Sequence, residues 1–135
     1  MADFTPEERA AMRERAKEAK ENATKEEALA QVLEKIAKMD PADRALGEKV
    51  HELVIKHAPN LMPKTWYGMQ AYSRDGKPVI FFQDAGKFKA RYATLGFQDS
   101  AALDDGNMWP TSYALIKIDA ATEKQIVALI KKAAA

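Results

Sequence analysis

The first half of the chain spaces its apolar side chains by three and four residues, as in amphipathic helices. One such stretch follows Thr24 and a second follows Asp40-Pro41. Their apolar positions are Ala28, Leu29, Val32, Leu33 and Ile36 in the first, and Leu46, Val50, Leu53 and Val54 in the second. The residues at the two starts are typical of helix N-termini. The pattern predicts two packed helices, the second ending near Ala58.

A further helix is predicted ahead of these two, from a capping motif at Thr5-Pro6-Glu7-Glu8 to about Asn22. Its interior is mostly Ala, Glu, Lys and Arg, and Met12 is its only large apolar side chain. The segment therefore has helix propensity but little surface to bury. We expect residues 1–23 to form a peripheral polar helix and residues 24–135 to form the folded domain.

From Lys64 onward, short stretches rich in aromatic and β-branched residues replace the helical spacing. They predict strands over residues 65–72, 78–83, 88–95 and 112–118, with a turn at Asp75-Gly76 between the first two. Asp119 is predicted to cap a last helix, whose apolar stripe is Ile126, Val127, Leu129 and Ile130. The order of elements predicts a two-layer α+β domain, in which an antiparallel sheet of about four strands packs against helices.

Composition narrows the functional classes. Of the 135 residues, 47% are hydrophobic and 30% are charged, which is typical of a folded domain. The absence of cysteine excludes disulfides, thiolate metal sites and a cysteine nucleophile. The net charge is only +1, so a dedicated nucleic-acid-binding protein is not expected.

The N-terminal sequence is acidic and polar, and no apolar run approaches the roughly 18 residues of a membrane span. We therefore expect a cytoplasmic protein without a membrane partner.

The predicted strand over residues 88–95 carries an unusual charge pattern. Lys87, Lys89 and Arg91 alternate with Phe88, Ala90 and Tyr92, so the cations share one face. A solvated outer face is the more common explanation of such alternation. An anion-binding site is the functional alternative, because three cations on one face concentrate positive potential.

Aromatic residues are concentrated in the predicted strand over residues 65–72. There Trp66, Gly68, Gln70 and Tyr72 are expected on one face, where they either line a cleft or fill the core. Trp109, in a predicted loop, is a candidate to close such a cleft.

Evidence for a metal site or for catalysis is weaker. Asp99, Asp104 and Asp105 cluster in sequence and offer oxygen ligands for a hard cation, and Glu48 precedes His51 by three residues. Caps and solvated surface explain the same residues. No phosphate-binding loop, dinucleotide fingerprint, nucleophile elbow or zinc-protease motif is present, so no catalytic residue is identified.

The order of several short motifs resembles a known family. Ala58-Pro59 is followed by Trp66-Tyr67-Gly68-Met69, by Gly76-Lys77 and by the aromatic strand that ends at Phe82. This order is similar to the YdhG-like domains of unknown function over roughly residues 28–133. The resemblance implies a curved antiparallel sheet packed against helices. Some relatives are described as frataxin-like intracellular iron chaperones, so it also implies iron delivery. Gln70 departs from the proline usual in that family.

These observations favour a non-enzymatic module that binds a small anionic or aromatic ligand. The predicted ligand-binding residues are Lys89, Arg91, Trp66, Gln70, Tyr72 and Trp109. No cofactor is expected for such a module. One alternative is an iron-binding chaperone that uses Asp99, Asp104 and Asp105, for which the cofactor would be iron. Another is an adaptor whose N-terminal helix meets a protein partner.

Overall fold

The computed structural model describes residues 5–135, apart from the side chains of residues 14, 15 and 17–23. The first helix, α1 (Pro6–Ala37), begins as predicted, because the Thr5 side chain accepts a hydrogen bond of 3.1 Å from the Glu8 amide. The predicted break near Thr24 is wrong, since α1 continues through it. A capping motif starts a new helix only where a helix-breaking residue ends the preceding one. The interior of α1 contains neither glycine nor a second proline, so the helix continues through Thr24.

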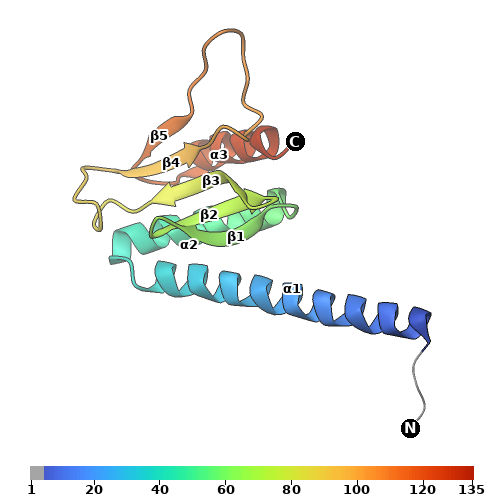
Figure 1. The fold of residues 1–135 in the computed structure, drawn as a ribbon. Helices are drawn as coiled ribbons and strands as arrows, with labels where there is room; N and C mark the ends of the chain where they lie inside the picture. The colour runs from blue at the N-terminus through green and yellow to red at the C-terminus, as the bar shows by residue number, and fades with distance from the viewer. Residues whose placement is uncertain (1–4) are drawn as a thin grey trace.

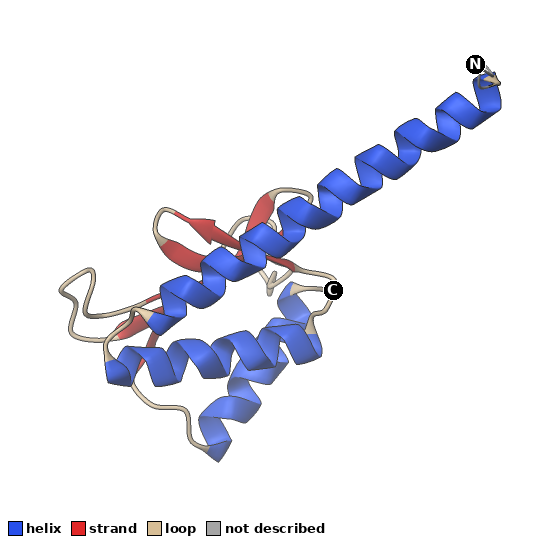
Figure 2. Ribbon diagram, turned by 90° about the horizontal axis from the view of Figure 1, so that it is seen from below, coloured by secondary structure: helices blue, strands red, loops and turns tan. Residues whose placement is uncertain are grey.

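The two halves of α1 have different surroundings. Its N-terminal half projects away from the rest of the molecule (Figures 1 and 2). Its C-terminal half buries Val32 and Ile36 in the core, and Gln31 lies within 3.5 Å of Thr65 at the edge of the sheet. The division of residues 1–23 from the folded domain stays a prediction, although no helix end marks it.

The other helices follow the sequence pattern closely. Helix α2 (Pro41–His57) ends before Pro59, and α3 (Ala120–Ala133) begins at Asp119, whose side chain accepts a hydrogen bond of 2.8 Å from the Thr122 amide. Figure 2 shows α2 and α3 gathered on one side of the sheet. In the part of the chain that the structure describes, no helix is both long and apolar enough to cross a membrane.

The sheet is an open antiparallel meander in which each strand pairs with the next along the chain. Its strands are β1 (Met62–Trp66), β2 (Met69–Arg74), β3 (Lys77–Gln83), β4 (Ala93–Phe97) and β5 (Ser112–Leu115). An α+β fold with an antiparallel sheet packed against helices is thus confirmed. The described sheet has five strands rather than about four, because the predicted strand over residues 65–72 is two strands joined by a turn.

That turn consists of Tyr67 and Gly68, with φ of 48° and 73°. Two residues with positive φ joining antiparallel strands form a hairpin turn that favours Asn-Gly or Asp-Gly. The sequence did not predict this turn, because an aromatic residue such as Tyr67 next to Trp66 is more typical of a continuing strand. The predicted turn at Asp75-Gly76, with φ of 51° and 78°, is confirmed.

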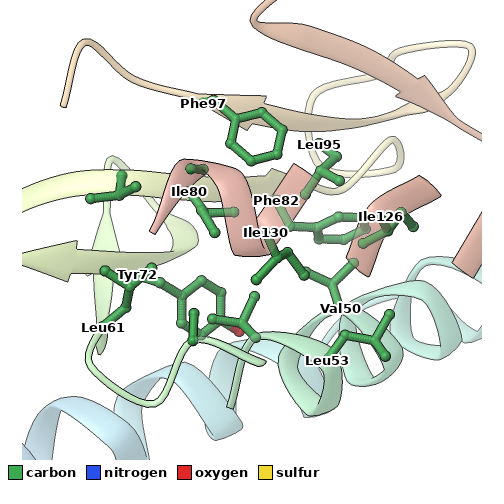
Figure 3. Close-up of a cluster of buried hydrophobic side chains, with 14 of the residues drawn as sticks. Val50, Leu53, Leu61, Tyr72, Ile80, Phe82, Leu95, Phe97, Ile126 and Ile130 are labelled. Carbon is green, nitrogen blue, oxygen red and sulfur yellow. The ribbon is translucent and has the colours of Figure 1, made fainter. Parts of the chain in front are cut away.

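The core lies between the helices and one face of the sheet. Across the three central strands, Gln70 is opposite Phe82 and Phe82 opposite Leu95, so their side chains share this face. Figure 3 shows the inner residues of the strands meeting those of α2 and α3. The largest fully buried apolar side chains are Tyr72, Phe82, Leu61, Ile80, Leu95 and Ile130.

On the opposite face of the sheet, an aromatic ring packs closely against a glycine of the neighbouring strand. Phe81 lies opposite Gly96, and a Cβ atom added to that glycine would fall 2.0 Å from the Phe81 ring. Trp66 packs beside Phe81, with 5.5 Å between ring centroids. Ala71, which lies on the same face between Lys64 of β1 and Phe81 of β3, is fully buried. This face therefore carries its own small aromatic layer.

Candidate functional site

The connections of an antiparallel meander alternate between the two ends of the sheet. The Tyr67–Gly68 turn and the β3–β4 connection, residues 84–92, therefore share one end, and Figure 1 shows the α1–α2 junction beside them. The β2–β3 turn and the β4–β5 connection lie at the other end. Three segments that are distant in sequence thus meet at one place.

A polar pocket of about 280 Å³ lies where these segments meet. It is lined by Lys35, Lys38, Met39, Asp40, Asp84, Gly86 and Lys87. Lys38 already pairs with Glu34 at 2.7 Å and is mostly exposed. The other charged side chains that line the pocket are Lys35 and Asp84, which are at least partly buried, and Lys87 and Asp40, which are exposed at its rim.

The pocket wall is fixed by a carboxylate at the start of α2. Asp43 accepts hydrogen bonds from the backbone amides of Gly86, at 2.9 Å, and Ala85, at 3.3 Å. A Cβ atom on Gly86 would come within 2.3 Å of the Asp40 carboxylate and 3.2 Å of the Asp43 carboxylate. The two hydrogen bonds to Asp43 hold the segment that carries Lys87 against α2.

Lys35 and Asp84 form the inner part of the pocket. The Lys35 Nζ atom lies 3.7 Å from Asp84 Oδ1, and the two side chains are 18% and 5% exposed. This distance allows an ion pair but is too long for a hydrogen bond, and Asp84 Oδ1 is buried without a hydrogen-bond donor. The pocket therefore holds a carboxylate whose bonding capacity is not filled by the protein.

The two lysines oppose each other electrostatically. Burial lowers the pKa of Lys35, the neighbouring Lys87 ammonium lowers it further, and Asp84 only partly offsets both. The Lys87 Nζ atom donates a 3.2 Å hydrogen bond to the Gly68 carbonyl, which ties the β3–β4 connection to the Tyr67–Gly68 turn. Lys35 thus interacts both with a buried carboxylate and with a second ammonium group, and an added anion would reduce the repulsion between the two lysines.

Aromatic side chains flank this end of the sheet. Tyr67 is 81% exposed, and its ring meets Trp66 edge-on with 5.0 Å between centroids. Trp66 in turn contacts Phe81 on the outer face of the sheet. A row of three aromatic rings therefore begins at the turn to which Lys87 is bonded.

The structure does not bring the predicted ligand-binding residues together. Lys89 and Arg91 lie in the irregular β3–β4 connection, because β4 begins only at Ala93 and the predicted strand start at residue 88 is wrong. Both are exposed; Lys89 has φ of 52°, and Arg91 lies over the Tyr92 ring at 5.3 Å. The alternation of charged and aromatic residues was not sufficient to predict a strand here, because residues 88–92 do not pair with a neighbouring strand.

Trp66, Gln70 and Tyr72 were expected on one face, which is also wrong. The Tyr67–Gly68 turn reverses the chain, so Trp66 points to the outer face while Gln70 and Tyr72 point into the core. Trp109 lies in the β4–β5 connection, at the opposite end of the sheet from Lys89. There it lines a separate cavity of about 350 Å³ beside Phe97.

Gln70 and Tyr72 belong to a buried hydrogen-bond chain. The Gln70 amide donates to the Gly47 carbonyl at 3.1 Å and to the Tyr72 hydroxyl at 3.0 Å, and that hydroxyl lies 2.9 Å from His51 Nδ1. Burial raises the pKa of Tyr72 and lowers the pKa of His51. Neutral side chains are thus favoured, as expected of a structural network.

The proposed metal ligands do not converge. The described residues include no group of three or more His, Asp or Glu side chains arranged to hold a metal ion. This applies both to Asp99, Asp104 and Asp105 and to Glu48 with His51, whose Nδ1 is occupied by Tyr72. The donor set that iron would need is therefore not assembled by these residues.

Sequence reasoning found Lys87 but missed its partners. Lys35 lies on the last turn of α1 and Asp84 directly follows β3, so their meeting depends on how α1 docks against the sheet. The one local signal was Gly86, a glycine three residues after the end of β3, since a glycine next to a strand often marks a close backbone approach.

Comparison with known proteins returns no match to a protein-family model, to a curated protein or to a solved structure.

Proposed function

We propose that this protein is a non-enzymatic module that binds a small anion in the pocket between Lys35 and Lys87. The observation that carries the proposal is that Lys35 lies beside the buried carboxylate of Asp84 while a second ammonium group, that of Lys87, lines the same pocket. The protein thereby keeps two cations close together, with one carboxylate, Asp84, buried beside Lys35 and a second, Asp40, exposed at the rim.

The electrostatic balance favours an anion of modest charge. Two unit charges 4 Å apart interact by about 4 kcal/mol at the effective dielectric constant near a protein surface. An anion between Lys35 and Lys87 gains two such contacts and removes part of their mutual repulsion. Asp84 and the rim carboxylate of Asp40 oppose it, so we expect an anion that also offers a hydrogen-bond donor, such as hydrogen phosphate.

The expected affinity follows from the exposure of the site. Lys87 is exposed and Lys35 is only partly buried, so solvent screens both contacts. A net gain of about 4 kcal/mol corresponds to a dissociation constant near 1 mM. The family resemblance to YdhG-like domains stays a prediction, and we do not extend the proposal to iron because no described residues fit its donor set.

The test is a titration of the protein with sodium phosphate at constant ionic strength, in which the amide chemical shifts are measured by NMR at each phosphate concentration. We expect saturable shifts centred on Gly86, Lys87 and Gly68. Lys87→Gln removes one charge-assisted contact and should weaken binding roughly tenfold or more. Lys124→Gln, which makes the same charge change on α3 outside the pocket, is the matched control and should leave binding unchanged.

Two results would count against this proposal. One is the absence of a saturable shift through the millimolar range. The other is equal binding by the parent protein and by Lys87→Gln. Because Lys87 is exposed, its replacement should not unfold the protein, so either result bears on the site itself.

A further inference from the structure

The Tyr67–Gly68 turn breaks a local sequence preference beside the anion pocket. Hairpin turns of this kind favour Asn, Asp or Gly where φ is positive, and the β2–β3 turn follows that rule with Asp75-Gly76. Tyr67 occupies the equivalent position of the β1–β2 turn with φ of 48°. A bulky residue at such a φ is strained, and strain of this kind is often retained for function.

Burial does not explain the tyrosine. Its side chain is 81% exposed, and its one ring contact is a T-shaped one with Trp66, so most of the ring is accessible to solvent or to a ligand. The contact with Trp66 restricts where the ring can move. The turn thus presents an aromatic ring that the fold does not bury.

The backbone of this turn is bonded to one of the pocket's cations. Lys87 donates to the carbonyl of Gly68, which is the next residue after Tyr67, and adjacent Cα atoms are about 3.8 Å apart. A hypothetical Cβ atom on Gly68 would lie 2.3 Å from the Lys87 Nζ atom, so the ammonium group sits directly against this residue, and the φ of 73° favours glycine there. The turn therefore has one residue that seats a cation and one that displays an aromatic face.

We propose that the ligand of this site is a nucleotide, with its phosphate between Lys35 and Lys87 and its base stacked on Tyr67. This inference rests on the anion site proposed above and adds the class of ligand. A nucleotide carries a phosphate and a flat aromatic base separated by one sugar, which suits a pocket with two cations, one of them bonded to the turn that carries an exposed aromatic ring. The net charge of +1 favours a free nucleotide over a nucleic-acid strand.

The experiment compares four probes by calorimetry and amide shifts: inorganic phosphate, ribose 5-phosphate, adenosine and adenosine 5′-monophosphate. Stacking of one base on an aromatic side chain should make the monophosphate bind roughly 5- to 150-fold more tightly than ribose 5-phosphate. Adenosine, without the phosphate, should bind weakly. A short single-stranded oligonucleotide is the fifth probe, and tighter binding of the strand than of the mononucleotide would overturn the assignment to a free nucleotide.

Tyr67→Asn is the decisive variant. Asparagine favours positive φ and forms the preferred Asn-Gly turn, so this change removes the ring without disturbing the hairpin. It should abolish the preference for adenosine 5′-monophosphate and leave phosphate binding unchanged. Tyr92→Asn, at a tyrosine on the same connection as Lys87 but outside the turn, is the control and should keep the preference.

The outcomes separate the two proposals. If phosphate and ribose 5-phosphate bind but the base adds nothing, the anion site stands and the nucleotide assignment fails. An equal preference for the monophosphate in Tyr67→Asn also defeats the assignment. If no probe binds, both proposals fail.

Discussion

The hydrogen-bond chain through Tyr72 offers the sharpest test of how the core is built. Both hydrogens of the Gln70 amide are used, one on Gly47 and one on the Tyr72 oxygen. The Tyr72 hydroxyl must then donate to His51 Nδ1, which places the proton of neutral His51 on Nε2. Replacing Tyr72 by phenylalanine removes this relay and keeps the ring that fills the core.

The size of the effect follows from what is lost. Two buried hydrogen bonds, at 2.9 and 3.0 Å, disappear, while the Gln70 amide keeps its bond to Gly47. Each such bond contributes about 1 kcal/mol net, and part is recovered because the phenylalanine needs no partner. We expect Tyr72→Phe to lower the free energy of unfolding by about 1–2 kcal/mol at neutral pH.

The loss should depend on pH in a definite direction. Burial holds the pKa of His51 below its ordinary 6.5, so the unfolded chain binds a proton before the folded protein does. The stability contributed by neutral His51 is therefore complete above pH 6.5 and is lost as the pH falls through the folded-state pKa. Protonation at Nδ1 also breaks the bond to Tyr72, so the tyrosine hydroxyl contributes less in acid. The penalty of Tyr72→Phe should be smaller at about pH 5 than at about pH 7.5.

Urea denaturation of both proteins at the two pH values measures this difference. Tyr113→Phe is the matched control, because Tyr113 is half-buried and has no hydrogen bond to the described residues; its stability should change by less than about 0.5 kcal/mol. A Tyr72→Phe protein as stable as the parent, or one with the same penalty at both pH values, would refute the proposed relay.

Three further predictions concern other parts of the fold. Gly96→Ala should destabilise the protein by about 1–3 kcal/mol in denaturation experiments, because the new methyl group collides with Phe81, and much less in a Phe81→Ala background. Asp119→Ala should lower Tm at neutral pH and less in strong acid: hydrogen bonds from Thr122 lower the pKa of Asp119, so its capping contribution is lost as the pH falls through that pKa. Asp43→Ala should cost about 1.5–3 kcal/mol and speed amide exchange at Gly86, whereas Asp43→Asn, which keeps one acceptor oxygen, should cost less.

Much of the fold follows from signals that are local in the sequence. The Asp75-Gly76 turn, the Asp119 cap and the apolar stripe of α2 all depend on residues within one turn or hairpin of one another, and the structure confirms them. The continuity of α1 could not be predicted from the sequence, because the capping motif at Thr24 is compatible with a helix start but does not show that the preceding helix ends there.

The candidate site depends on contacts that no local pattern contains. Lys35 and Lys87 meet because α1 docks along β1 and because the meander returns the β3–β4 connection to the same end of the sheet. The Tyr67–Gly68 turn is a local feature, but the sequence did not predict it because tyrosine is unusual at this turn position. A position where local preference fails at an exposed residue is where function is expected to override stability.

The two polar clusters of this protein should respond to mutation in opposite ways. In the Tyr72 chain the donors point at neighbouring protein groups inside the core, so substitutions there should change stability and leave ligand binding intact. In the pocket, the wall is held by Asp43 and the backbone amides, and the Lys87 ammonium group makes only one hydrogen bond to the described protein. Replacing Lys87 should therefore alter binding at little cost in stability. A reversal of this pattern, in which Lys87→Gln unfolds the protein and Tyr72→Phe changes anion binding, would place the functional site in the core and not in the pocket.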